Sequence, residues 1–251
     1  MVKAFVHGNP ETPAIWRPLV AALLDRGVDD IVLLSPPGFG ASVPEGFDAT
    51  PQAYVGWLAT EVRTLGAPVD LVGHDWGAGH VAGLVAAHPD LVRSWAIDVP
   101  GLLHPDYTWH DAAQAWQTPE IGEQVIAMMT AMPVADRVAM YVGLGMDDST
   151  AAELAAALDD DMGRCILSLY RGAVQPYLRD LADRIAAGPR VPGLFLNALD
   201  DPYVAAALGE EVADRLGASL VPLANQSHWW MLDDPGPAAD ALAGFWSRLD
   251  G

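Results

Sequence analysis

The sequence predicts a single α/β domain built on a mostly parallel sheet of about six strands, with helices on both faces. Short apolar runs alternate along the chain with longer stretches of helical periodicity, and the runs are too apolar to leave one side in water. The chain has 251 residues and is 51% hydrophobic, so it is long enough to bury one substantial core.

Six apolar runs are the predicted strands, and they lie at 4–6, 30–34, 69–72, 94–99, 191–196 and 219–223. Helical patterns connect or follow them at 13–26, 51–65, 81–87, 204–216 and 237–249. Parallel neighbours need crossover connections, and helices serve as these connections. The alternation therefore predicts a sheet that is covered on both faces.

The segment 101–187 breaks the alternation. It has helical patterns at 121–132, 151–158 and 162–170 but no strand pattern. We predict a helical cap inserted after the fourth strand, over the carboxyl ends of the strands, where open α/β sheets place their ligands. This divides the chain into a core (1–100 and 188–251) and a cap (101–187).

Composition excludes several classes of function. With 13 Lys and Arg against 33 Asp and Glu, the formal net charge of −20 repels nucleic acid and anionic membranes. The apolar start of the chain is too short for a signal peptide, and no run approaches the roughly 18 apolar residues of a membrane helix. The single Cys165 permits no internal disulfide and is predicted to be buried in a helix. We therefore expect a cytoplasmic protein, and the absence of nucleotide and metal motifs predicts no cofactor and no metal.

A tight turn lies between the third predicted strand and its helix, at Gly73-His74-Asp75-Trp76-Gly77. The glycines on either side let the backbone fold sharply without a Cβ clash, so the side chain of Asp75 is pushed out at the end of the sheet. The flanking His74, like His80, is predicted to pack or to form hydrogen bonds.

Four motifs in this order resemble the α/β-hydrolase superfamily: His7-Gly8-Asn9-Pro10, the turn at 73–77, Asp201 before a proline, and His228. More narrowly, they resemble the branch with an aspartate nucleophile, the epoxide hydrolases and haloalkane dehalogenases. The similarity covers essentially the whole chain, although two antiparallel strands that often precede the first motif are missing. It implies the α/β-hydrolase fold.

The resemblance implies a role for each of these residues. Asp75 is the nucleophile, which attacks an electrophilic sp3 carbon and forms an alkyl ester. His228 is the general base, which activates the water that hydrolyses the ester. Asp201 is the acid that orients His228, and Asp98, at the end of the fourth strand, is the reserve candidate. The backbone N–H groups of Asn9 and Trp76 are the expected oxyanion donors.

The leaving group is open. Tyr170, in Leu169-Tyr170-Arg171, resembles the tyrosine of epoxide hydrolase caps that donates a proton to the epoxide oxygen. The side chains of Asn9 and Trp76 instead resemble the halide donors of haloalkane dehalogenases. We favour an epoxide hydrolase, with a haloalkane dehalogenase as the alternative and a ligand-binding receptor of this fold as the non-enzymatic alternative. The expected partners are a small apolar organic substrate and water, and further predicted pocket residues are Pro10, Trp109, His110, Trp116 and Trp229.

Overall fold

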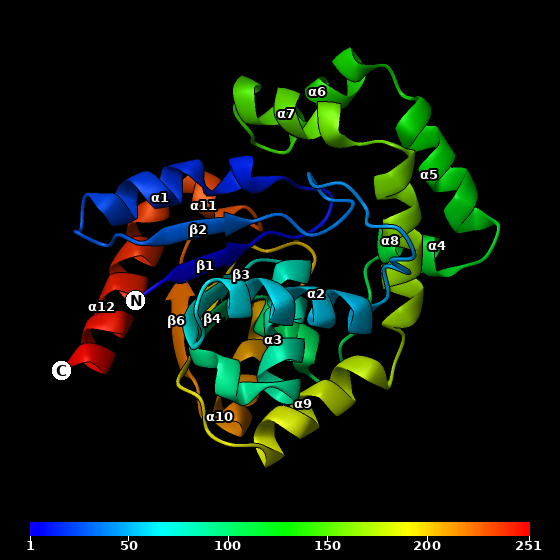
Figure 1. Cartoon of the computed structure of the whole chain (residues 1–251). Coiled ribbons are helices and arrows are strands. Elements are labelled where there is room, and N and C mark those ends of the chain that lie inside the picture. Colours follow the sequence, from blue (N-terminus) through cyan, green and yellow to red (C-terminus); the bar gives the residue numbers. More distant parts are fainter.

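The computed structural model describes residues 1–251 and contains one sheet of six strands in the order β2-β1-β3-β4-β5-β6, all paired in parallel (Figure 1). The strands are β1 (Lys3–Val6), β2 (Ile31–Leu34), β3 (Val69–Gly73), β4 (Val92–Asp98), β5 (Gly193–Ala198) and β6 (Ser219–Leu223). The predicted α/β class and six-stranded parallel sheet are thus confirmed.

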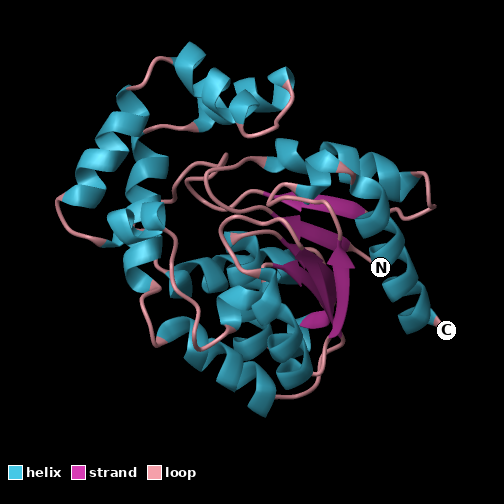
Figure 2. Cartoon of the chain, turned by 180° about the vertical axis from the view of Figure 1, so that it is seen from behind, coloured by secondary structure: helices cyan, strands magenta, loops and turns pink.

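Helices cover both faces of the sheet (Figures 1 and 2). One face carries η1 (Pro13–Trp16), α1 (Arg17–Leu24), α11 (Trp230–Asp233) and α12 (Pro235–Asp250). The other face carries α2 (Pro51–Thr64), α3 (Trp76–Ala87), α9 (Tyr177–Ala187) and α10 (Gly209–Leu216). Short 3-10 turns are η2 (Pro89–Leu91), η3 (Pro100–Leu103) and η4 (Ala206–Leu208).

The two faces of the sheet have separate cores because successive strand side chains point to opposite sides. Phe5 and Val72 pack in the core under α1 and α12, whereas Val6 and Leu71 pack in the core under α2 and α3. All four side chains are fully buried, as strands of a doubly covered parallel sheet require.

The start of α3 differs from the prediction. The helix begins at Trp76, although the sequence pattern indicated a start near Val81. Its first turns contain Gly77 and Gly79, which are weak helix formers. A Cβ on Gly77 would lie 2.0 Å from the carbonyl oxygen of Val6, so the glycine lets the helix approach β1. Tertiary packing here outweighs local propensity.

The segment between β4 and β5 is helical, as predicted. Besides α9, it contains α4 (Asp111–Gln117), α5 (Ile121–Ala131), α6 (Val134–Gly143), α7 (Asp148–Ala157) and α8 (Asp160–Gly172). The sequence patterns do not predict α4, α6 or α9. In Figure 1, α4 to α8 lie beyond the carboxyl ends of the strands, whereas α9 packs against the core helix α3. Cys165 is buried in α8, as expected. The division into core and cap stays a prediction.

No single helix has both the length and the hydropathy needed to cross a membrane; only α5 and α6 taken together, bent by 104°, meet those criteria.

Candidate active site

Asp75 occupies the tip of the turn between β3 and α3, with φ 51° and ψ −119°, a backbone conformation that is strained for a residue with a side chain. A Cβ on Gly73 would lie 2.6 Å from the carbonyl oxygen of Gly77, so the turn is too tight for any other residue there. The backbone N–H of Asp75 donates to Oδ1 of Asp98 at 3.0 Å. This turn places the Asp75 carboxylate in a cavity that residues of the helical segment between β4 and β5 also line.

The two oxygens of the Asp75 carboxylate have different neighbours. Oδ1 accepts a hydrogen bond from the backbone N–H of Asn9 at 2.9 Å. Oδ2 lies 3.9 Å from Nε2 of His228. Burial raises the pKa of Asp75 to about 6, although the neighbouring His228 acts in the opposite direction. The carboxylate is therefore mostly ionised above that pH.

His228 is held from its other side by Asp201. Its Nδ1–H donates to Oδ2 of Asp201 at 2.8 Å, and Oδ1 of Asp201 accepts the backbone N–H groups of Tyr203 and Val204. Burial alone would lower the pKa of His228, but the hydrogen bond and charge of Asp201 raise it above its ordinary value. The structure thus aligns Asp201, His228 and Asp75 in one row.

Asp98 is the other sequence candidate for orienting the base, and the structure does not bring it to His228. Its carboxylate accepts hydrogen bonds from His74, from the N–H of Asp75 and from the indole of Trp230. None of these donors is His228, whose Nδ1–H donates to Asp201 instead.

A largely apolar cavity of about 120 Å³ opens above the Asp75 carboxylate. Four of the five further residues predicted for the pocket line it, namely Pro10, His110, Trp116 and Trp229. The fifth, Trp109, lines a smaller adjoining hollow with Asp75 and Trp76. The remaining lining residues are Asn9, Asp75, Ala112, Met140, Tyr141, Leu144, Tyr170, Tyr203 and His228.

Asn9 and Tyr170 meet inside this cavity, although 161 positions separate them in the sequence. The side-chain Nδ2 of Asn9 donates to Oη of Tyr170 at 3.3 Å, while the Asn9–Pro10 peptide is cis. Burial raises the pKa of the Tyr170 phenol well above its usual value, so it stays protonated. The buried indole nitrogen of Trp116, whose ring lies 4.8 Å from that of Tyr170, has no hydrogen-bond partner.

Some site residues differ from the sequence expectations. The backbone N–H of Asn9 contacts the Asp75 carboxylate as expected, but that of Trp76 forms no hydrogen bond with it. Tyr203 is a residue that the sequence reasoning missed, and its ring lies 4.9 Å from that of His228. The signal that indicates it is its position two residues after Asp201, in the loop that follows β5.

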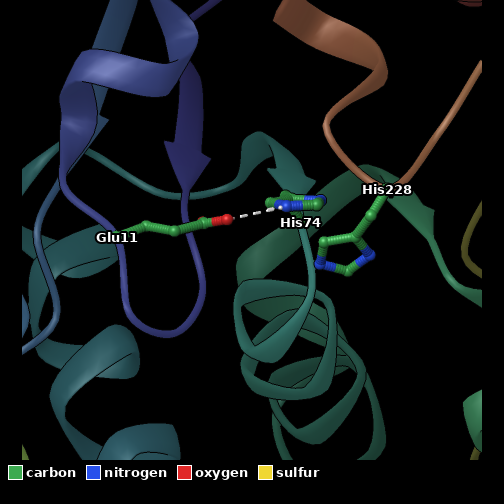
Figure 3. Close-up of side chains that lie close together, drawn as sticks. All are labelled: Glu11, His74 and His228. Carbon is green, nitrogen blue, oxygen red and sulfur yellow. Dashed lines mark hydrogen bonds and ion pairs between the residues drawn. The ribbon is translucent and has the colours of Figure 1, made fainter. Parts of the chain in front are cut away.

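Glu11 is a second missed residue. Its carboxylate, His74 and His228 are all buried and each offer a metal-ligand atom within 4.8 Å of the others (Figure 3). The signal is its position directly after the His7-Gly8-Asn9-Pro10 motif, which puts it at the carboxyl end of β1. Glu11 therefore lies next to the row of Asp201, His228 and Asp75.

Comparisons with known proteins agree with this architecture. A model of the alpha/beta hydrolase family matches residues 4–241. A haloalkane dehalogenase of Bradyrhizobium diazoefficiens is 32% identical over 114 residues, which cover 44% of this chain and only 34% of that relative.

Two solved structures are similar over nearly the whole chain. The haloalkane dehalogenase DbeA from Bradyrhizobium elkani USDA94 has 22% identity and a TM-score of 0.77, with 99% of this chain and 90% of that chain covered. An E-2-(acetamidomethylene)succinate hydrolase has 20% identity and a TM-score of 0.69, with 98% and 91% covered. At these identities the structural matches establish the fold and no particular reaction.

Proposed function

The chain belongs to the alpha/beta hydrolase family, and from this premise we propose that it hydrolyses a small substrate at an sp3 carbon through an ester on Asp75. The observation that carries the proposal is the position of the Asp75 carboxylate between the N–H of Asn9, at 2.9 Å, and Nε2 of His228, at 3.9 Å. A carboxylate needs no prior deprotonation to displace a leaving group from carbon, so an aspartate at this turn suits that chemistry.

In the first step, Oδ2 of Asp75 attacks the substrate carbon, and the leaving group departs with its bonding electrons. In the second step, Nε2 of His228 takes a proton from water, and the resulting hydroxide attacks the ester carbonyl carbon. The N–H of Asn9 stabilises the negative charge that develops on Oδ1. Collapse of this intermediate expels the alcohol, which leaves with the proton carried by His228. The carboxylic acid that remains on Asp75 then loses its proton to the solvent, and this restores the carboxylate.

We place halide first as the leaving group, so the proposed reaction is that of a haloalkane dehalogenase. Two N–H donors support this choice: the amide of Asn9, whose present bond to Tyr170 is long, and the unpartnered indole of Trp116. The partial match to a named haloalkane dehalogenase points the same way. The cavity of about 120 Å³ suits a short haloalkane, because a cavity of about 150 Å³ accommodates benzene.

Epoxide opening is the second candidate, and one observation favours it. The phenol oxygen of Tyr170 accepts a hydrogen bond from Asn9, which leaves the phenol O–H free to donate to an epoxide oxygen. The order of preference is therefore the reverse of the one that the sequence motifs alone supported. We favour halide as the leaving group for two reasons. Asn9 lines the same cavity as Asp75, and the chain partly matches a haloalkane dehalogenase.

The test uses His228→Gln protein incubated in parallel with 1-bromobutane and 1,2-epoxybutane. We expect intact-protein mass spectrometry to reveal an alkyl adduct that is absent from the Asp75→Asn, His228→Gln double variant, and peptide mass spectrometry after digestion to locate it on the peptide of Asp75. A receptor of this fold would bind the probe and form no adduct. An adduct that persists in the double variant would refute the proposed mechanism.

Turnover by the unmutated protein then decides the leaving group. We expect bromide release that falls about 100-fold in Asn9→Ala, because one donor to the departing charge is lost. If the protein turns over the epoxide, Tyr170→Phe should abolish diol formation. Tyr177→Phe, in α9 and outside the cavity, is the matched control. Diol formation without bromide release would select the second candidate.

A further inference from the structure

His74 is completely buried between two carboxylates. Its Nε2–H donates to Oε1 of Glu11 at 3.0 Å, and its Nδ1–H donates to Oδ2 of Asp98. Figure 3 shows the Glu11 carboxylate facing the ring of His74, with His228 on the other side of that ring. An ionised carboxylate only accepts hydrogen bonds, so both ring nitrogens must carry a hydrogen. His74 is therefore an imidazolium cation that balances one of the two negative charges.

Glu11 connects this cation to two of the loops at the site. Its Oε2 accepts the backbone N–H of Gly8 at 2.8 Å, directly before Asn9. Its Oε1 also accepts the indole N–H of Trp229, the residue after His228, at 2.7 Å. One buried side chain thus fixes both the loop of the oxyanion donor and the loop of the base.

Asp98 connects the same cation to the turn. Its Oδ1 accepts the backbone N–H of Asp75 at 3.0 Å, and its Oδ2 accepts the indole N–H of Trp230 at 2.7 Å. The two consecutive tryptophans after the base are therefore each bonded to a different carboxylate. The hydrogen bonds of this set are charge-assisted, and all but the one from the N–H of Asp75 are buried, which makes them strong and geometrically restrictive.

We propose that Glu11, His74 and Asp98 form a buried clamp that joins the oxyanion loop, the nucleophile turn and the base loop, and that they act as positioning residues. The inference rests on the proposed roles of Asn9, Asp75 and His228. The clamp contributes to the reaction by keeping these three groups in register, without touching the substrate itself.

A metal centre is the competing interpretation of the same cluster, since Glu11, His74 and His228 could supply three ligands. Zinc binds a histidine through the lone pair of a deprotonated ring nitrogen. Both nitrogens of His74 already carry hydrogens that are donated to carboxylates. His74 therefore has no free lone pair on either ring nitrogen with which to bind a metal ion.

The clamp also acts on the base through its charge. The rings of His74 and His228 lie 4.7 Å apart, and the positive charge of His74 lowers the pKa of His228. Burial acts on His228 in the same direction, while Asp201 and Asp75 oppose it. Other titratable groups that face the base or interact with its charge are Glu11, His110 and Tyr203.

The first test needs no substrate. NMR of the protein labelled with 15N on its seven histidines reports the protonation of each ring nitrogen, and His74→Gln assigns the signal. We expect His74 to carry both protons from pH 5 to pH 9, because the two carboxylates hold its pKa well above the ordinary value despite burial. Loss of a proton within that range, or displacement of the His74 signal by one equivalent of Zn²⁺, would overturn the clamp.

The second test is kinetic and uses 1-bromobutane or 1,2-epoxybutane, whichever the unmutated protein turns over. Glu11→Gln and Asp98→Asn should each lower kcat about 100-fold with little change in KM, because small misplacements of reacting groups cost about that much. In His74→Gln the acidic limb of the pH profile should move to higher pH, because the base loses a neighbouring positive charge.

Asp70→Asn is the matched control, since Asp70 is an equally buried carboxylate whose partners, Arg93 and Ser94, lie away from the site. It should lose stability and keep its kcat. Clamp variants with an unchanged kcat and pH profile would refute the positioning role. If the unmutated protein turns over neither probe, the proposed function fails, and the NMR experiment still decides the clamp.

Discussion

Gly8 lies so close to the proposed nucleophile that a methyl group at this position has no room. A Cβ built on Gly8 would lie 2.2 Å from Oδ1, 2.5 Å from Cβ and 2.7 Å from Cγ of Asp75, whereas real Cβ contacts are essentially never below 3.0 Å. The backbone of Gly8 is outside the left-handed region, so alanine meets no conformational strain there. The perturbation in Gly8→Ala is therefore steric and is directed at one side chain.

The size of the effect follows from these distances. Three atoms of Asp75 would lie too close to the added methyl group. Rotating the Asp75 side chain moves its carboxylate but not its Cβ, so rotation cannot remove the clash with that Cβ. The carboxylate and the loop must therefore separate by about 1 Å, a displacement that typically costs about 100-fold in rate. Overpacking of this kind also costs about 1–3 kcal/mol of stability.

The assay is the rate of covalent adduct formation on Asp75, followed by intact-protein mass spectrometry in the His228→Gln background, together with thermal unfolding. Gly56→Ala is the control, because Gly56 lies in α2 with no atom within 4 Å of a Cβ built there. It should keep its adduct rate and gain about 0.5–1 kcal/mol of stability. An unchanged adduct rate in Gly8→Ala would refute the position assigned to the Asp75 carboxylate.

Three further perturbations have defined outcomes. Asp201→Asn should slow hydrolysis of the preformed ester at least about 100-fold in single-turnover experiments, because His228 loses the partner that orients it; an equal loss in adduct formation would contradict this. Leu71→Ala should lower the free energy of unfolding in urea by about 3 kcal/mol, because removing this fully buried side chain leaves a cavity in the core beside β3. Burial lowers the pKa of His7 to about 4 and of His80 to about 3, so the unfolded chain binds more protons below pH 6.5. Stability should therefore fall on acidification from about pH 6.5 toward pH 4, and His80→Gln should reduce that slope in urea midpoints measured across this range.

Local patterns were sufficient for most of the fold. All six strands lie where apolar runs predict them, because a doubly covered parallel strand must be apolar on both faces. The turn at Asp75 could also be predicted from the sequence, since glycine spacing and backbone sterics are properties of adjacent residues. The first turns of α3 could not be predicted from the sequence, because close contact with β1, and not helix propensity, accounts for Gly77 in this helix.

The sequence favoured Asp201 as the acid that orients His228 and kept Asp98 in reserve, but it did not decide between them. Asp98 is the last residue of β4 and Asp201 follows β5, its parallel neighbour, so both lie at the same edge of the sheet. What separates them is the set of donors around each one. Asp98 is already occupied by His74 and by the N–H of Asp75, whereas Asp201 faces Nδ1 of His228.

The sequence by itself determined the sheet, the insertion of a helical segment after β4 and the aspartate at the turn, because each depends on residues close together in the chain. Tertiary structure alone decided that Asn9 bonds to Tyr170 and that Glu11 joins His74 in a buried clamp. These contacts link residues 161 and 63 positions apart. No local pattern encodes them, because the distance between such groups is set by how the helices and loops pack over the end of the sheet.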